Sequence, residues 1–118
     1  MQSVSQTIDK KTMELVNILD DCVATCNNCA TKDLMEPDLS EMVRCIRLDI
    51  DCSDACSLTS HYLSRGSEFT TGMLVQCALI CDACAEECEK HSDMPHCVEC
   101  ARVCRNCAQE CRQFRKEK

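Results

Sequence analysis

The chain has 118 residues, a formal net charge of −7, 15 cysteines, one Tyr, two Phe and no Trp. Its length predicts one domain, residues 1–118, and its acidity argues against a nucleic-acid partner, because nucleic acid binds basic faces. The sequence contains no run of about 18 apolar residues, the length that a membrane-spanning helix needs. Because the amino terminus lacks an apolar signal core, we expect a cytoplasmic protein, in which cysteine-rich patterns indicate metal or redox chemistry rather than disulfides.

The first two predicted helices cover residues 5–31 and about 38–64. Asp38 lies in the sequence DLSE, where it is expected to cap the second helix, with Glu41 three residues later. Arg65-Gly66 is expected to end that helix, because glycine readily adopts the left-handed conformation that closes helices.

The third and fourth predicted helices cover residues 67–90 and about 93–116. Gly72 weakens the first turns of the third helix, whereas Pro95 suits the first turn of the fourth, where its missing N–H costs little. The connections are short, which favours antiparallel neighbours. The predicted fold is therefore all-α, an up-down-up-down four-helix bundle with a cysteine-lined core.

Each predicted helix carries a cluster of cysteines on one face. Within a cluster nearly every gap is three or four residues, the spacing of neighbours on a helix surface, whereas a strand requires steps of two. The one exception is the gap of seven between 45 and 52. The clusters are Cys22, Cys26 and Cys29; Cys45, Cys52 and Cys56; Cys77, Cys81, Cys84 and Cys88; and Cys97, Cys100, Cys104, Cys107 and Cys111.

In a bundle these stripes face the central axis, where several kinds of chemistry compete. A soft apolar core needs no cysteine, because Leu or Ala fills such positions without oxidation. Disulfides between cysteines one helical turn apart have poor geometry, and an odd number of cysteines cannot pair completely within one chain. Thiolates are ligands for Cu(I), zinc or iron–sulfur clusters.

The spacing favours Cu(I) among these metals. The familiar iron–sulfur run C-x2-C-x2-C-x3-C-P is absent, and zinc requires closed tetrahedra rather than even stripes. Cu(I) accepts two or three thiolates, and cysteines one helical turn apart can lean together around one ion. The resulting two-coordinate pairs are Cys22/Cys26, Cys52/Cys56, Cys77/Cys81, Cys84/Cys88, Cys100/Cys104 and Cys107/Cys111.

Charge sets the expected load. Bare thiolates in a narrow core are very costly, and one Cu(I) per thiolate cancels their charge. We expect about one Cu(I) per cysteine, roughly fifteen per chain, with proton release during loading.

The segment CIRLDIDCSDAC (45–56), C-x3-C-x2-C-x3-C on the third helix and H-C-x2-C-x3-C-x2-C-x3-C on the fourth together resemble the bacterial copper storage proteins, in particular their cytosolic branch. The resemblance covers residues 15–112. It implies a homotetramer of four-helix bundles that stores Cu(I). It also implies that His96 and Asp49 join the copper sites near one mouth; Asp49 stands where the family has Asn.

The two ends of the bundle are expected to differ. One end is a hydrophobic plug of Ile8, Leu15 and either Ile18 or Leu19, beside Cys56, Cys77 and Cys111. At the other end, thioether and imidazole groups are candidate weak ligands near Cys29, Cys45, Cys88 and Cys97; they are Met35, Met42, His91, Met94 and His96.

Plainer interpretations of these residues stay open. The alternative for Met42 and Met94 is that they fill gaps in the apolar core, as methionine does in other proteins. His91 fits a solvated helix end, His61 falls off the thiol face of its helix, and Met73 fits the apolar core near the plug.

Our interpretation is cytoplasmic storage or sequestration of multiple Cu(I) ions by a protein that is not an enzyme. The alternatives are a zinc or mixed-metal buffer resembling metallothionein, and an iron–sulfur or thiol redox protein. A copper chaperone or a low-molecular-weight thiol is a candidate partner for loading.

Overall fold

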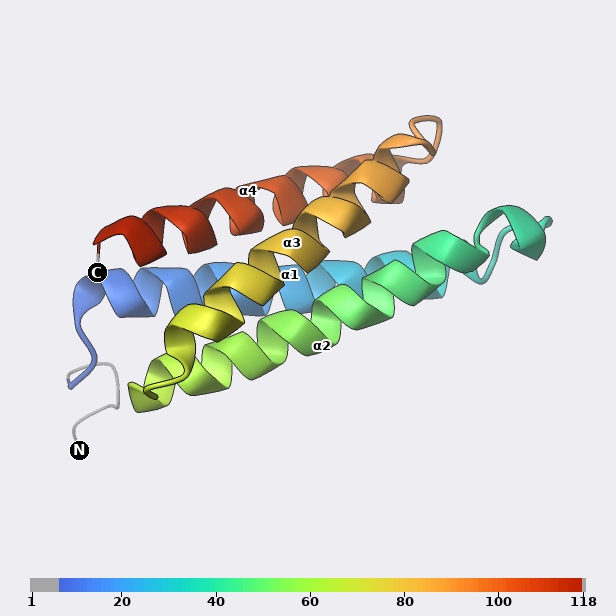
Figure 1. Ribbon diagram of the computed structural model, residues 1–118. Coiled ribbons are helices and arrows are strands. Elements are labelled where there is room, and N and C mark those ends of the chain that lie inside the picture. The colour runs from blue at the N-terminus through green and yellow to red at the C-terminus, as the bar shows by residue number, and fades with distance from the viewer. Residues whose placement is uncertain (1–6, 118) are drawn as a thin grey trace.

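The computed structural model describes residues 7–117, which form four long α-helices and one 3-10 turn. Figure 1 shows the helices running antiparallel along a rod. They are α1 (Lys10–Asp33), α2 (Val43–Arg65), α3 (Thr70–Glu89) and α4 (Pro95–Glu117), and the turn is η2 (Leu39–Glu41). The predicted all-α fold is confirmed.

Each helix packs against two neighbours around a common axis. α1 contacts α2 and α4, and α3 contacts the same two helices. The α1–α2 and α3–α4 connections lie at one end of the rod, and the α2–α3 connection lies at the other, beside the start of α1 and the end of α4 (Figure 1). The Cα atoms extend over 48 × 32 × 18 Å. This arrangement is the predicted up-down-up-down order.

The start of the first helix differs from its prediction. The prediction began at Ser5, which lies outside the described residues, and α1 begins at Lys10. Asp9 is its N-cap, with a side-chain oxygen that accepts a hydrogen bond from the Thr12 backbone N–H at 2.9 Å. This bond satisfies an amide that the helix itself leaves unpaired.

The start of the second helix was also predicted too early. Asp38 does cap a helical segment, but that segment is the short turn η2, in which Asp38 accepts from the Ser40 backbone N–H at 3.1 Å. Met42 follows with φ −105° and ψ −5°, and α2 begins only at Val43. The fully buried Met42 side chain explains this interruption, because the turn carries it inward.

The connection between α2 and α3 contains a longer break than predicted. Gly66 adopts φ 63°, and its backbone N–H bonds to the Leu63 carbonyl at 3.1 Å, as expected for a helix-ending glycine. The predicted start of the third helix at residue 67 was wrong, since α3 begins at Thr70. Ser67 holds the intervening turn, with its hydroxyl accepting from the Phe69 backbone N–H at 3.1 Å.

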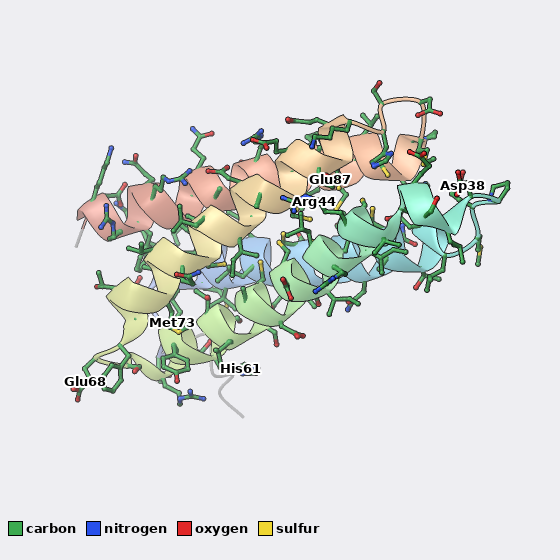
Figure 2. All side chains as sticks on the ribbon, turned by 45° about the vertical axis from the view of Figure 1, so that its right-hand side comes forward. Asp38, Arg44, His61, Glu68, Met73 and Glu87 are labelled. Atoms are coloured by element: carbon green, nitrogen blue, oxygen red, sulfur yellow. The ribbon has the colours of Figure 1, made fainter. Side chains whose placement is uncertain are left out.

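The outer surface of α4 forms ion pairs with α3. Arg105 bonds to Glu89 at 2.9 Å and to Asp82 at 3.2 Å on α3, and Arg112 bonds to Asp82 at 2.6 Å. Figure 2 shows a comparable pairing of Arg44 and Glu87 between α2 and α3, 3.3 Å apart. Partly exposed pairs of this kind contribute up to about 1 kcal/mol each. The core therefore supplies most of the bundle's stability.

No helix among residues 7–117 combines the length and the apolarity needed to cross a bilayer.

Candidate metal centre

The thiol groups of all 15 cysteines lie in the interior, where none is more than 1% exposed. All are free thiols, and none is part of a disulfide. The helical steps of three and four residues explain this arrangement, because they keep each stripe turned toward the bundle axis. We call the resulting array the thiol column.

Sulfur atoms from different helices are as close as those from one helix. Two predicted pairs within a helix, Cys77/Cys81 and Cys100/Cys104, have sulfur atoms 4.0 and 3.9 Å apart. Contacts across the bundle include Cys52–Cys81 at 3.5 Å, Cys26–Cys104 at 3.6 Å and Cys56–Cys81 at 3.6 Å. The column is therefore a continuous network.

The thiols also group in fours that share members. In each of these tetrads the ligand atoms all lie within 4.8 Å of one another. Four all-cysteine tetrads are Cys22/Cys26/Cys52/Cys104, Cys22/Cys52/Cys56/Cys81, Cys26/Cys84/Cys100/Cys104 and Cys56/Cys77/Cys81/Cys107. Because neighbouring tetrads share two sulfurs, ions bound in adjacent tetrads would be bridged by those sulfurs.

Asp49 interrupts the thiols of α2. Its side chain is fully buried, with Oδ1 3.2 Å from the Cys84 sulfur and 3.6 Å from the Cys100 sulfur. Burial, and after it the charge interactions with nearby cysteines, Cys84 first, raise the pKa of Asp49 to about 11. Without metal the carboxyl is therefore held neutral at pH 7 and donates or accepts hydrogen bonds among the thiols.

His96 was predicted to join the copper sites near one mouth of the bundle. Its hydrogen-bond partner, Asp33, was not predicted. His96 Nε2 lies 2.8 Å from Oδ1 of Asp33, so that the ring N–H donates to the carboxylate. Asp33 is fully buried, and its Oδ1 also lies 3.6 Å from the Cys97 sulfur. Burial, followed by the contact with Cys45, raises the pKa of Asp33 to about 6, and the bond from His96 opposes this rise.

The pattern could have revealed Asp33. It follows Cys29 by four residues, which is the next step of the stripe on α1. We call this part of the column, with the α1–α2 and α3–α4 connections, the Asp33 end.

The methionines and the remaining histidine of the Asp33 end differ in how far they are buried. Met42 is fully buried in the cluster that contains the thiols, and Met94 is half-buried against it. Met35, by contrast, is 75% exposed, so the expectation that it joins this group was wrong. His91 is half-buried rather than solvated, because its Nε2 lies 3.2 Å from Oε2 of the buried Glu87.

The opposite end of the column is apolar, as predicted. Four buried leucines close it, and we call it the leucine end; they are Leu15, Leu19, Leu63 and Leu74. Ile18 is half-buried against the same cluster, and Ile8 is half-buried beside a cavity of about 420 Å³. Leu74 rather than Met73 occupies the inward position of α3 before Cys77. His61 is exposed on the outside of α2, as expected (Figure 2).

Burial also governs the thiols. It raises the pKa of Cys97, and the neighbouring negative charge of Asp33 raises it further. For Cys104, contacts with surrounding thiols, Cys100 first, and then burial raise the pKa. The neutral thiol is therefore favoured at Cys97 and Cys104, and a metal that binds these two sulfurs must displace their protons.

The family model of the copper storage proteins matches residues 8–116. The chain is 44% identical over 77 residues to the cysteine-rich protein YhjQ of Bacillus subtilis (strain 168), covering 65% of this chain and 70% of YhjQ.

Two solved structures have the same fold. The Cu(I)-bound copper storage protein BsCsp3 from Bacillus subtilis is 38% identical, with a TM-score of 0.83 over 88% of this chain and 97% of its own. A cytosolic copper storage protein from Streptomyces lividans, solved with five coppers, is 35% identical, with a TM-score of 0.87 over 91% of this chain and 93% of its own. The chain therefore belongs to the copper storage protein family.

Proposed function

We propose that this protein stores multiple Cu(I) ions, which are its cargo, along the thiol column. The observation that carries the proposal is the burial of all 15 thiols in one connected interior. Cu(I) is a soft ion that thiolate ligands select. A relative of similar fold binds Cu(I), and another was solved with several coppers.

The shared sulfurs of the tetrads favour Cu(I) over zinc as the main cargo. The tetrads Cys22/Cys26/Cys52/Cys104 and Cys22/Cys52/Cys56/Cys81 have Cys22 and Cys52 in common. Closed tetrahedral zinc sites need four ligands each, so filling these two tetrads together would require both shared sulfurs to bind two zinc ions each. Cu(I), with two or three thiolates, uses such bridging sulfurs in a ratio of one ion per thiolate.

The candidate ligands are the 15 cysteines, with Asp49, His96, Met42 and Met94 at or near the Asp33 end. Asp49 faces several sulfurs of the column, and Met42 is buried among them. His96 must release Asp33 if Nε2 is to bind copper, because that nitrogen is already in a hydrogen bond. The apolar side chains of the leucine end offer copper no ligand, so loading proceeds from the Asp33 end.

The proposal extends to the protein's setting. Storage needs no catalytic step, so we propose that the protein is not an enzyme. A cytoplasmic location follows the description of the Streptomyces lividans relative as cytosolic. Assembly as a homotetramer rests on the family resemblance, and exchange with a copper chaperone or a low-molecular-weight thiol would move copper in and out.

Anaerobic titration of the reduced, metal-free chain with Cu(I), in competition with a Cu(I) chelator, tests the function. Saturation is expected near one ion per cysteine, about fifteen per chain, with about one proton released per ion. A parallel titration with Zn²⁺ serves as the control. Saturation with Cu(I) at only three or four ions would contradict the bridged arrangement and favour the zinc-buffer alternative.

A further inference from the structure

The thiol stripe of α1 ends in a carboxylate. Cys22, Cys26 and Cys29 are followed by Asp33, with gaps of four, three and four residues. The position after Cys29 in this rhythm would hold a thiol if the pattern continued. Asp33 points into the bundle and has no exposed surface, which is costly for a carboxylate unless it has partners.

The partners of Asp33 form a compact set of donors. Its Oδ1 lies 3.6 Å from the Cys97 sulfur, and its Oδ2 lies 3.9 Å from the Cys29 sulfur. The Cys45 sulfur completes a tetrad in which all four ligand atoms lie within 4.8 Å of one another and all four residues are buried. It differs in composition from the all-cysteine tetrads, because one of its donors is oxygen.

This donor set suits a divalent ion of borderline softness. Zn²⁺ binds thiolate sulfur at about 2.3 Å and carboxylate oxygen at about 2.0–2.2 Å in a tetrahedron. Ligand atoms of such a tetrahedron are separated by roughly 3.3–3.8 Å, by the geometry of those bond lengths. Oδ1 of Asp33 lies 3.6 Å from the Cys97 sulfur, within this range, and 4.0 Å from the Cys29 sulfur, close to it. Cu(I), in contrast, gains little from a carboxylate oxygen.

His96 supports the oxygen ligand from outside the tetrad. Its Nε2 is 2.8 Å from Oδ1 of Asp33, and its side chain is 12% exposed. A hydrogen bond from an imidazole N–H orients a carboxylate and thereby the lone pairs that it offers to a metal. The second oxygen of Asp33 remains available on the side of Cys29.

We propose that Cys29, Asp33, Cys45 and Cys97 form a binding site for one divalent cation of the zinc class at the Asp33 end of the column. A divalent ion also compensates more of the charge of three thiolates and a carboxylate than a single Cu(I) does. The site rests on its own donors and not on copper storage. It gives this chain one position with a metal preference different from that of the all-sulfur tetrads.

The test is to add one equivalent of Zn²⁺ to the reduced, metal-free full chain and to record zinc K-edge X-ray absorption. Wild type is expected to show three sulfur ligands and one oxygen. The Asp33→Cys variant, which completes the stripe, is expected to show four sulfurs. Four sulfurs in wild type would overturn the proposal, because zinc would then occupy an all-cysteine tetrad.

Zinc affinity gives the second readout, measured by competition with a chromophoric chelator. Asp33→Asn is expected to weaken the binding of the first zinc ion more than about tenfold. Asp21→Asn provides the matched control, since Asp21 is exposed on the same helix and its variant should bind zinc as wild type does. Equal affinity of Asp33→Asn and wild type would overturn the proposal.

Two further measurements keep the outcome unambiguous. Circular dichroism of each variant establishes that the helices are intact, and Asp33→Cys provides the answer if Asp33→Asn does not fold. Cu(I) capacity is measured in parallel, and Asp33→Asn should keep it to within about one ion. A wild-type chain that binds only a few Cu(I) ions would contradict copper storage. The zinc K-edge spectrum would still decide whether the zinc site exists.

Discussion

Asp49 illustrates how one residue of the column can be understood from its position. Cys45, Asp49, Cys52 and Cys56 are separated by four, three and four residues, the same rhythm as the cysteines of α3. The carboxyl group therefore takes a place that a thiol would otherwise hold, with the Cys84 sulfur 3.2 Å from its Oδ1. In the metal-free protein this environment keeps it neutral.

This neutral carboxyl predicts a dependence of stability on pH. An aspartate in an unfolded chain titrates near pH 4, whereas burial raises the pKa of Asp49 to about 11 in the folded chain. Between these values the folded state holds a proton that the unfolded state releases, so the free energy of unfolding falls as pH rises. Asp49→Asn should make that fall shallower, by at most about 1.4 kcal/mol per pH unit.

Urea unfolding of the reduced, metal-free protein at about pH 6 and about pH 8 measures this difference. Titration of the thiols affects wild type and variant alike, so the difference between their slopes reports on Asp49. Parallel slopes for the two proteins would show that Asp49 is ionised in the folded state, contrary to the prediction.

The four helices were predictable because the chemistry repeats at the helical period. The stripes determine which face of each helix turns inward, and the leucines before Cys22 continue the same face on α1. Local capping decides where a helix begins, and the sequence DLSE led to a wrong boundary. Its Asp38 caps a 3-10 turn, because the chain changes direction again at Met42.

The contacts across the bundle were not predictable from spacing. Cys52 and Cys81 come within 3.5 Å because α2 and α3 pack at a particular height relative to each other. That height depends on the lengths of the connections and the packing of the whole core. Asp33 was not among the predicted ligands, although it follows Cys29 by four residues, at the next step of the stripe on α1.

Met94, just before α4, and His96, in its first turn, supply a prediction about loading. Met94 is half-buried against the core, and His96 is bonded to Asp33 at the same end. Replacing both, as Met94→Ala with His96→Ala, should slow the uptake of Cu(I) from a chelator complex, because copper loses its first ligands. Capacity should remain nearly unchanged, since the thiols are intact.

Stopped-flow absorption of the chelator complex measures the rate. His61→Ala is the control, because His61 is exposed on α2 and lies away from the thiol face. If the double variant took up copper as fast as wild type, loading through the Asp33 end would be contradicted.

α3 offers a matched pair of leucines at the leucine end and on the surface. Leu74 is 2% exposed, whereas Leu79 on the same helix is 55% exposed. Leu74→Ala should lower the free energy of unfolding by about 2–5 kcal/mol through lost burial and a cavity, and Leu79→Ala should change it by no more than about 0.5 kcal/mol. Denaturant unfolding of the metal-free protein measures both.

Copper capacity should not change in either leucine variant that folds, because neither side chain binds metal. Equal destabilisation by the two substitutions would contradict the assignment of Leu74 to the apolar end. A smaller copper load in folded Leu74→Ala would contradict the separation of that end from the thiol column.

At the scale of the whole molecule, the bundle is a rod whose interior changes character along its length. Leucines close one end, thiols fill the middle, and carboxylates, methionine and histidine gather at the other. The chain has a formal net charge of −7, and its surface carries pairs of opposite charges between helices. Metal ions that neutralise thiolates can therefore occupy the interior without adding to the charge of the rod.

A crystal structure of the Cu(I)-loaded chain, with anomalous scattering recorded at the copper edge, tests the central claim most directly. The account predicts about one copper for each of the 15 cysteines, aligned within the bundle and bridged by sulfurs of different helices. Copper found only on the outer surface, or a bundle whose sulfurs have paired as disulfides and hold no copper, would contradict it.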